Sequence, residues 1–259
     1  MKKSKETKEN PADGILIRSL RILELIFRNE YSPNAAQISE ILNIPRPTVN
    51  RLIAQLVQYG YLKREVSNKS LIAGENLEKL SLQSLRRSVS SGPQKEVLRQ
   101  LSLKVGETCN IATVSKGQAL YLERVEADWP LTFRLDPGSS VPLHASAIGK
   151  MLLSQLSIKE QQKYAKSLFL VKYTAQTITD ADELLQHLAL INKQGYSIDD
   201  EEYLIGVRGL AVSIPLMKKQ STPIALAIAA PSIRYDLNAL KQVLPDAQAA
   251  AKKLTYCFI

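Results

Sequence analysis

Three features of the sequence predict an α+β protein built from two domains. Residues 13–74 hold three apolar-periodic segments and then two short basic runs, the pattern of three helices followed by a two-stranded ribbon. Residues 93–259 mix helical segments with paired strand-like runs, which predicts an antiparallel sheet flanked by helices. Residues 75–92 have helical periodicity and predict a linker helix, with a hinge over 88–93, where Gly92 precedes Pro93.

The first domain begins with a helix that carries more apolar surface than a small domain needs. Residues 1–12 are polar and lysine-rich, and we expect a disordered arm there. The helix predicted over residues 13–29 repeats large apolar side chains at a 4-3-4 spacing, with isoleucines beside them: Leu16, Leu20, Leu23 and Phe27, then Ile15, Ile22 and Ile26. This width suggests the hypothesis that the helix also packs on a second subunit.

The next stretch predicts a helix-turn-helix. Ser32 followed by Pro33 marks a helix start. The short helix that follows is expected to bury Ile38, Ile41 and Leu42 before a break at residues 43–45. A second helix is predicted over residues 47–59, because Gly60 is a typical end signal. Strands over 61–66 and 70–73 complete a winged helix-turn-helix, whose second helix can lie in a DNA major groove.

The second helix has two faces of different chemistry. Val49, Leu52, Ile53 and Leu56 recur at helical spacing and predict the core face. The opposite face offers guanidinium, amide and hydroxyl groups but no carboxylate, and such groups bind base edges and phosphates. Candidate DNA-binding residues are Arg46, Pro47, Thr48, Asn50, Arg51, Gln55 and Gln58 on the helix, with Lys63, Arg64 and Lys69 on the wing. An ordinary solvated helix face is the alternative, but it does not explain the three-helix spacing or the basic ribbon.

The charge distribution agrees with a polyanionic partner. The net charge is +9, and residues 1–92 hold 15 Lys or Arg against 9 Asp or Glu, while residues 93–259 hold 19 against 16. Two cysteines do not make a disulfide framework, and no apolar leader or membrane-length segment is visible. We therefore expect a cytoplasmic protein without a membrane partner.

The second domain is predicted element by element from changes of period. Strands over 108–114 and 119–125 form a hairpin around residues 115–118, and a further strand over 131–135 precedes a turn at 136–140. Another hairpin and a short extended run are expected over 210–217, 223–229 and 196–199. Helices are predicted over 94–105, 144–153, 158–167, 181–194 and 237–256.

Taken in order, the motifs of the chain resemble the IclR family of bacterial transcription regulators, over about residues 14–251. The helix-turn-helix run Ile44-Pro45-Arg46-Pro47-Thr48-Val49-Asn50-Arg51-Leu52 fits, as do Gly106-Glu107-Thr108 and Tyr121-Leu122-Glu123-Arg124-Val125. Sharper matches are the run from Pro142 to Lys150, the run from Gly195 to Tyr203, and the run from Gly206 to Val212.

The resemblance implies an N-terminal winged domain, a linker helix and a C-terminal effector domain with a GAF-like sheet. Such proteins are dimers or tetramers that bind palindromic operators, and many are repressors controlled by a carboxylic or aromatic acid. The resemblance places the effector pocket at Ser146 and Ala147, at the start of a helix that attracts anions, with His144 nearby and Asp199 as the pocket acid.

Three positions depart from the family pattern and predict a different effector. Gly209 stands where the family often has cysteine, and Ala227 and Ala229 stand where a late strand usually carries two serines. Each lost hydroxyl costs a small polar acid about 1 kcal/mol of binding free energy. We therefore predict a larger or more apolar effector than glyoxylate-like acids, such as an aromatic acid.

Two other functions remain open from the sequence. A hydrolase-like enzyme with an accessory DNA-binding domain is one, although no nucleophile elbow surrounds Ser146 and no phosphate loop or dinucleotide fingerprint is present. A ligand-independent DNA-binding protein is the other. We expect no cofactor and no metal, although Cys109, His144 and an acid, or the acidic residues 199–202, are conceivable ligands.

Overall fold

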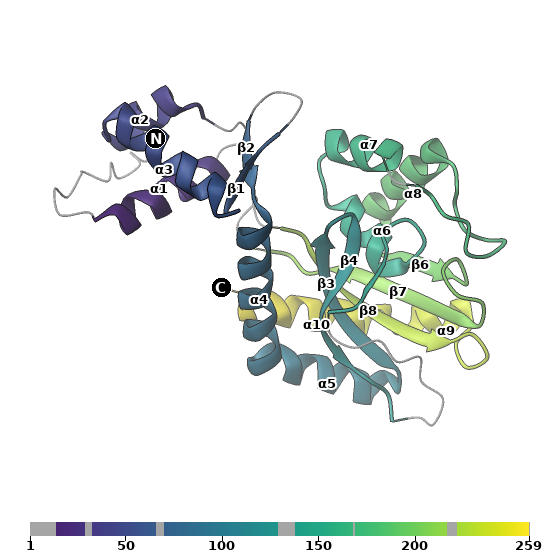
Figure 1. Ribbon diagram of the computed structural model, residues 1–259. Helices are drawn as coiled ribbons and strands as arrows, with labels where there is room; N and C mark the ends of the chain where they lie inside the picture. Colours follow the sequence, from purple (N-terminus) through teal and green to yellow (C-terminus); the bar gives the residue numbers. More distant parts are fainter. Residues whose placement is uncertain are drawn as a thin grey trace, which may run out of the picture. The chain divides into compact units, whose positions relative to one another are not determined.

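The computed structural model describes residues 14–28, 33–65, 70–128, 138–167, 169–216 and 222–258. The chain forms two compact units that divide between Ser84 and Leu85, within helix α4 (Glu75–Ser91). Each unit has its own hydrophobic core, and Figure 1 shows the elements of each. The predicted arm over 1–12 and the predicted strand over 131–135 lie outside the described residues. Within the described part of the chain, no helix is long and apolar enough to cross a membrane.

The first unit is a winged helix-turn-helix, as predicted. Three helices precede an antiparallel pair of short strands: α1 (Ile15–Arg28), α2 (Ala35–Leu42), α3 (Arg46–Gln58), β1 (Leu62–Arg64) and β2 (Leu71–Ala73). Strand β1 ends at Arg64, before its predicted end at residue 66, and β2 begins at Leu71, one residue later than expected. Residues 66–69 between the strands are not described. Gly74 follows β2 and approaches the backbone at Gly60 closely. Only glycine fits there, because a Cβ at this position would lie 2.2 Å from the Gly60 carbonyl oxygen.

The core of this unit contains only some of the apolar residues that the sequence predicted to be buried. On α1, Ile22 and Ile26 are buried, whereas Leu16 is 70% exposed and Leu20 and Phe27 are each 46% exposed. On α2, Ile38 is buried but Ile41 is 59% exposed, so the expectation that Ile41 faces the core is wrong. A helix of eight residues presents one narrow stripe, which is made by Ile38 and the half-buried Ala35 and Leu42.

Helix α2 is capped by Asn34, whereas Ser32, the expected start signal, lies outside the described residues. The Asn34 side chain accepts hydrogen bonds from the backbone N–H groups of Ala36 and Gln37, and the Gln37 side chain accepts from the Asn34 N–H. This reciprocal capping box satisfies backbone donors at the start of α2 that have no carbonyl partner within the helix. At the other end, Asn43 takes a left-handed conformation with φ 52°, and the Ser39 hydroxyl donates to the Ile44 carbonyl oxygen. These contacts fix the turn into α3.

The second unit is built on a six-stranded antiparallel sheet, as predicted. The strand order is β5-β4-β3-β8-β7-β6. The strands are β3 (Thr108–Ser115), β4 (Gln118–Val125), β5 (Ser140–Pro142), β6 (Ser197–Asp200), β7 (Val207–Ser213) and β8 (Ile224–Pro231). Strand β5 was not predicted; it begins at Ser140, the last residue of the predicted turn, and its three residues pair with the edge of β4. Strand β7 begins three residues before its predicted start and so includes Arg208 and Gly209.

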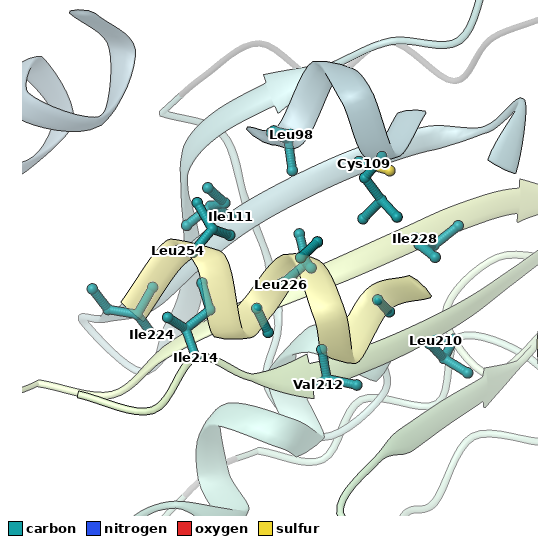
Figure 2. Packing of buried hydrophobic residues seen from close by; sticks show 14 of the residues in the cluster. Leu98, Cys109, Ile111, Leu210, Val212, Ile214, Ile224, Leu226, Ile228 and Leu254 are labelled. Carbon is teal, nitrogen blue, oxygen red and sulfur yellow. The ribbon is translucent and has the colours of Figure 1, made fainter. Parts of the chain in front are cut away.

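One face of this sheet packs against α5 (Pro93–Val105), α9 (Leu237–Gln242) and α10 (Leu244–Cys257). Figure 2 shows Leu254 of α10 beside Ile111 and Leu226 of the strands, in a wholly apolar cluster. The single closing helix that we predicted is interrupted at Val243, because Pro245 opens a new helix at the first turn of α10. The predicted hinge is also shorter, since α4 continues to Ser91 and Gly92 alone separates it from α5.

The opposite face is covered by α6 (Ala147–Ser154), behind which lie α7 (Ile158–Ser167) and α8 (Ala181–Gln194). Helix α6 begins at Ala147, not at His144, and all eight of its residues are buried. Gly149 lets α6 approach the backbone of Pro142 and Leu143, because a Cβ there would lie 2.5 Å from the Pro142 carbonyl oxygen and 2.6 Å from the Leu143 Cα. The start of α6 is thereby held over the middle of the sheet.

Candidate nucleic-acid interface and effector cavity

The polar face of α3 is open to solvent. The helix buries Val49, Leu52 and Ile53, and Leu56 is half-buried beside them. Most of the DNA-binding candidates lie on the exposed side: Arg46, Pro47, Asn50, Arg51, Gln55 and Gln58, with Thr48 half-buried. No carboxylate interrupts this face, so it presents hydrogen-bond donors and positive charge to a polyanion.

The wing adds two exposed cations on β1. Lys63 and Arg64 are both exposed, and Lys63 Nζ lies 3.5 Å from Glu78 Oε1 of α4. A surface ion pair of this kind is weak and leaves the lysine accessible to a phosphate. The third candidate, Lys69, lies outside the described residues.

In the second unit, a cavity of about 600 Å³ lies between the start of α6 and the strands of the sheet. Six of the seven predicted effector residues line it: Ser146, Ala147, Asp199, Gly209, Ala227 and Ala229. Ala227 and Ala229 come from β8, and Gly209 comes from β7 beside Asp199 of β6. Gly209 gives room for α6, because a Cβ there would lie 3.2 Å from the Ala147 Cβ.

Ser146 serves the helix that begins beside it. Its hydroxyl donates to the Pro142 carbonyl oxygen at 2.7 Å and accepts from the Gly149 N–H at 3.1 Å. The N–H groups of Ala147 and Ile148, in the first turn, have no carbonyl within the helix to bond. These two residues also line the cavity, so a positive helix end faces it.

Asp199 is held in the cavity wall by backbone donors. Its Oδ1 accepts from the Glu202 N–H at 2.7 Å and from the Tyr203 N–H at 3.4 Å. Burial, and after it the neighbouring Glu202 carboxylate, raise the pKa of Asp199 to about 7, against a lowering by Lys150 and by the two backbone hydrogen bonds. Near neutral pH this carboxyl group is therefore protonated in part of the molecules and can donate a hydrogen bond.

His144 does not line the cavity, which corrects its predicted placement. Its ring is buried, its Nε2 lies 3.0 Å from the Val171 carbonyl oxygen, and its centroid is 5.9 Å from that of Tyr173. Burial lowers the pKa of His144. His144 lies two residues before Ser146, the cap of α6, and its ring contacts the segment around Val171.

Several cavity residues escaped the sequence analysis. Asn110 of β3 and Tyr121 and Arg124 of β4 line the cavity, and Glu107 and Arg234 pair with each other at its wall, with 2.6 Å between Arg234 Nη2 and Glu107 Oε2. Strand alternation was the available signal, because Asn110 lies two residues from Thr108 and faces the same side of the sheet. The sequence did not show which face of the sheet carries the cavity, because that depends on the face that α6 covers.

Metal ligation finds no support in the described residues, among which no group of three His, Cys, Asp or Glu side chains comes together. Cys109, named above with His144 as a conceivable ligand, is buried in the apolar cluster on the other face of the sheet. Burial raises the pKa of its thiol above the usual range.

The fold and the two sites define a DNA-binding transcriptional regulator with a separate ligand-sensing domain. Residues 16–66 match the IclR helix-turn-helix domain, and residues 91–256 match the C-terminal domain of bacterial IclR transcriptional regulators. The chain belongs to the IclR family.

Relatives and solved structures agree over nearly the whole chain. A probable transcriptional regulator of Cupriavidus necator, SauR, is 32% identical over 251 residues, covering 96% of this chain and 99% of the relative. The transcriptional repressor IclR of Escherichia coli is 27% identical and covers 96% and 92%. The fold is shared with Thermotoga maritima IclR, with a TM-score of 0.61, 22% identity and coverage of 94% and 98%. It is also shared with an IclR homologue from Microbacterium hydrocarbonoxydans solved with 4-hydroxybenzoate, with a TM-score of 0.57, 21% identity and coverage of 94% and 99%.

Proposed function

We propose that this regulator is a repressor that reads its operator with the polar face of α3 and releases it when an organic acid fills the cavity of the second unit. The observation that carries the proposal is the exposure of Asn50, Arg51 and Gln58 on a helix that is firmly packed on its other side. Such side chains discriminate bases by hydrogen bonds in the major groove.

The effector we propose is a carboxylic acid with an apolar body, such as an aromatic acid. The positive start of α6 and the partly protonated Asp199 suit a carboxylate, whereas Ala227 and Ala229 offer no hydrogen bond to a small polar acid. The structural neighbour solved with 4-hydroxybenzoate supports this chemistry.

We further propose that the protein is a cytoplasmic homodimer, or a dimer of dimers, joined through α1. Leu16, Leu20 and Phe27 form an apolar stripe whose members are 46–70% exposed in the single chain. Stripes of this kind mark protein interfaces, and a two-fold dimer matches two half-sites of a palindromic operator.

The groove assignment is tested by Arg51→Ala. The variant is expected to bind operator selected from a random DNA pool at least fivefold more weakly than the parent, since one good base contact contributes about 1–3 kcal/mol. Fluorescence anisotropy at physiological salt measures the affinity. Arg99→Ala, which removes an exposed arginine from α5, is the matched control. Unchanged affinity of Arg51→Ala removes the groove assignment.

Effector control is tested by titrating acids into the operator complex. Release of DNA by an aromatic acid supports the regulator, and tight binding of two- or three-carbon acids in preference to aromatic ones contradicts the predicted effector class. Turnover of the same acids in the absence of DNA is the result that an enzyme would give.

A further inference from the structure

Asn110 presents an unused hydrogen-bond donor to the effector cavity. The residue is 1% exposed and lines the cavity from β3. Its Oδ1 accepts a hydrogen bond from Arg124 Nη1 at 3.1 Å, while its Nδ2 has no hydrogen-bond partner in the described structure. Buried amide donors are normally satisfied, so this donor is available to an acceptor atom that enters the cavity.

Arg124 fixes the direction of that amide and adds charge beside it. The two residues are paired across β3 and β4, and turning the amide over would set its NH2 group against the guanidinium donors. The Arg124 side chain is 5% exposed, and its Nε lies 3.5 Å from Glu126 Oε1, a long ion pair with a more exposed carboxylate. Glu107, a carboxylate of the same cavity wall, is paired with Arg234. An acceptor or anion at Asn110 therefore meets a donor and a guanidinium together.

Asn110 and Arg124 form one polar pole of the cavity, which is separate from a second polar pole at the start of α6. The α6 pole comprises Ala147, Gly209 and Asp199 over β7 and β6, whereas Asn110 lies on β3, with β8 between. Two strand spacings amount to roughly 10 Å of backbone separation. The β8 residues between the poles are Ala227 and Ala229, which pair with Asn110 and Thr108 and make the floor apolar.

We infer that the effector is a bifunctional acid, with one carboxylate at the start of α6 and a second anionic group at Asn110 and Arg124, joined by an apolar linker about as long as a benzene ring. The inference rests on the proposed function and names the chemical class of its ligand. The α6 pole recognises one acid group, the alanine floor accepts the linker, and the Asn110–Arg124 pair selects against acids that lack the second group.

The test compares matched probes by isothermal titration calorimetry on the full-length protein. Terephthalate and adipate are each measured against the monoacid that lacks the second carboxylate, benzoate and hexanoate. We expect at least one diacid to bind tenfold or more tightly than its monoacid. Asn110→Leu and Arg124→Met are expected to remove this preference, whereas Arg99→Met, which loses an exposed guanidinium on α5, keeps it.

A third variant separates loss of the subsite from loss of folding. Asn110→Asp keeps an acceptor for Arg124 Nη1 but replaces the donor by a carboxylate, so its thermal unfolding is expected to stay close to the parent's while the diacid preference falls tenfold or more. Equal affinities within each matched pair overturn the second subsite and leave the acid effector standing. Binding of none of the four acids overturns both. Retention of the preference in Asn110→Asp overturns the role of Asn110.

Discussion

Lys150 is a charged side chain inside the second unit, 1% exposed, and Glu202 is its partner. Its Nζ donates to Glu202 Oε1, and the Glu202 backbone is held in turn by the Thr177 hydroxyl, which donates to its carbonyl oxygen at 2.6 Å. The same segment supplies Tyr203 and Leu204 to the cavity wall. The buried pair therefore ties α6 to the segment after β6.

Breaking this pair is expected to be costly. Lys150→Met leaves the Glu202 carboxylate buried without its cation and is predicted to lower the free energy of unfolding by about 3–5 kcal/mol. Urea denaturation of the full-length chain measures it. In the double variant Lys150→Met/Glu202→Leu, both charges are gone and most of the loss is expected to return. A double variant no more stable than the single one contradicts this account.

Asp199 makes stability depend on pH in a defined direction. Its pKa is about 7 in the folded chain and near 3.8 in the unfolded chain, so between these values the folded state holds a proton that the unfolded state has lost. Its contribution to stability is therefore full below about pH 4, falls as pH rises toward 7, and is constant above that.

Asp199→Asn isolates the effect. The unfolding free energy of the parent minus that of the variant is expected to decline on the order of 1 kcal/mol per pH unit between about pH 4 and pH 7. Denaturation of both proteins across this range measures the difference. A difference that is flat or rises with pH shows that burial does not raise the pKa of Asp199.

At the scale of the element, α1 has one apolar face that is buried in the core and a second apolar face that is exposed to solvent. Ile22 and Ile26 fill the core of the first unit, while the stripe of Leu16, Leu20 and Phe27 remains in solvent. Burying a leucine side chain fully is worth about 1.5–3 kcal/mol, so a two-fold interface that covers this stripe on both subunits gains several such terms.

Leu16→Lys/Leu20→Lys is expected to shift the protein toward monomer and to weaken operator binding at least tenfold, because each half-site is then bound alone. Sedimentation equilibrium and fluorescence anisotropy measure the two effects. Gln162→Lys, at an exposed position of α7, is the control for added charge. A double variant that keeps the parent's assembly removes α1 from the interface.

At the scale of the whole molecule, α4 joins the two compact units. The division between Ser84 and Leu85 falls inside its residue range, and its later part contributes Val89 to the core of the second unit. A continuous helix is a stiff connection, so we predict that it carries the effect of the effector to the DNA-binding domain.

Ser84→Pro tests this coupling, because proline in a helix interior costs about 3 kcal/mol and interrupts its hydrogen bonds. The variant is expected to bind operator and acid separately but to lose the release of DNA by acid. Ser84→Ala, which keeps the helix, is the control. Both properties are measured by anisotropy with and without terephthalate, and full release of DNA from Ser84→Pro rules out α4 as the coupling element.

The sequence by itself determined the elements whose signals are local. The winged helix-turn-helix follows from the periodicity of Val49, Leu52 and Ile53 and from the break before Arg46, and the antiparallel sheet follows from two hairpin patterns. The exposed chemistry of α3 was predictable for the same reason, since a helix with one apolar face must show the other to solvent.

Only the tertiary structure decided which side chains meet in the cavity. Motifs placed Ala147, Asp199 and Gly209 together, but the position of His144 depended on where Ser146 capped α6. The pairing of Asn110 with Arg124 depended on the register of β3 with β4. These two side chains line the cavity only because α6 covers that face of the sheet and not the other. Cross-strand register and helix placement are set by contacts between distant parts of the chain, and no local pattern in the sequence carries them.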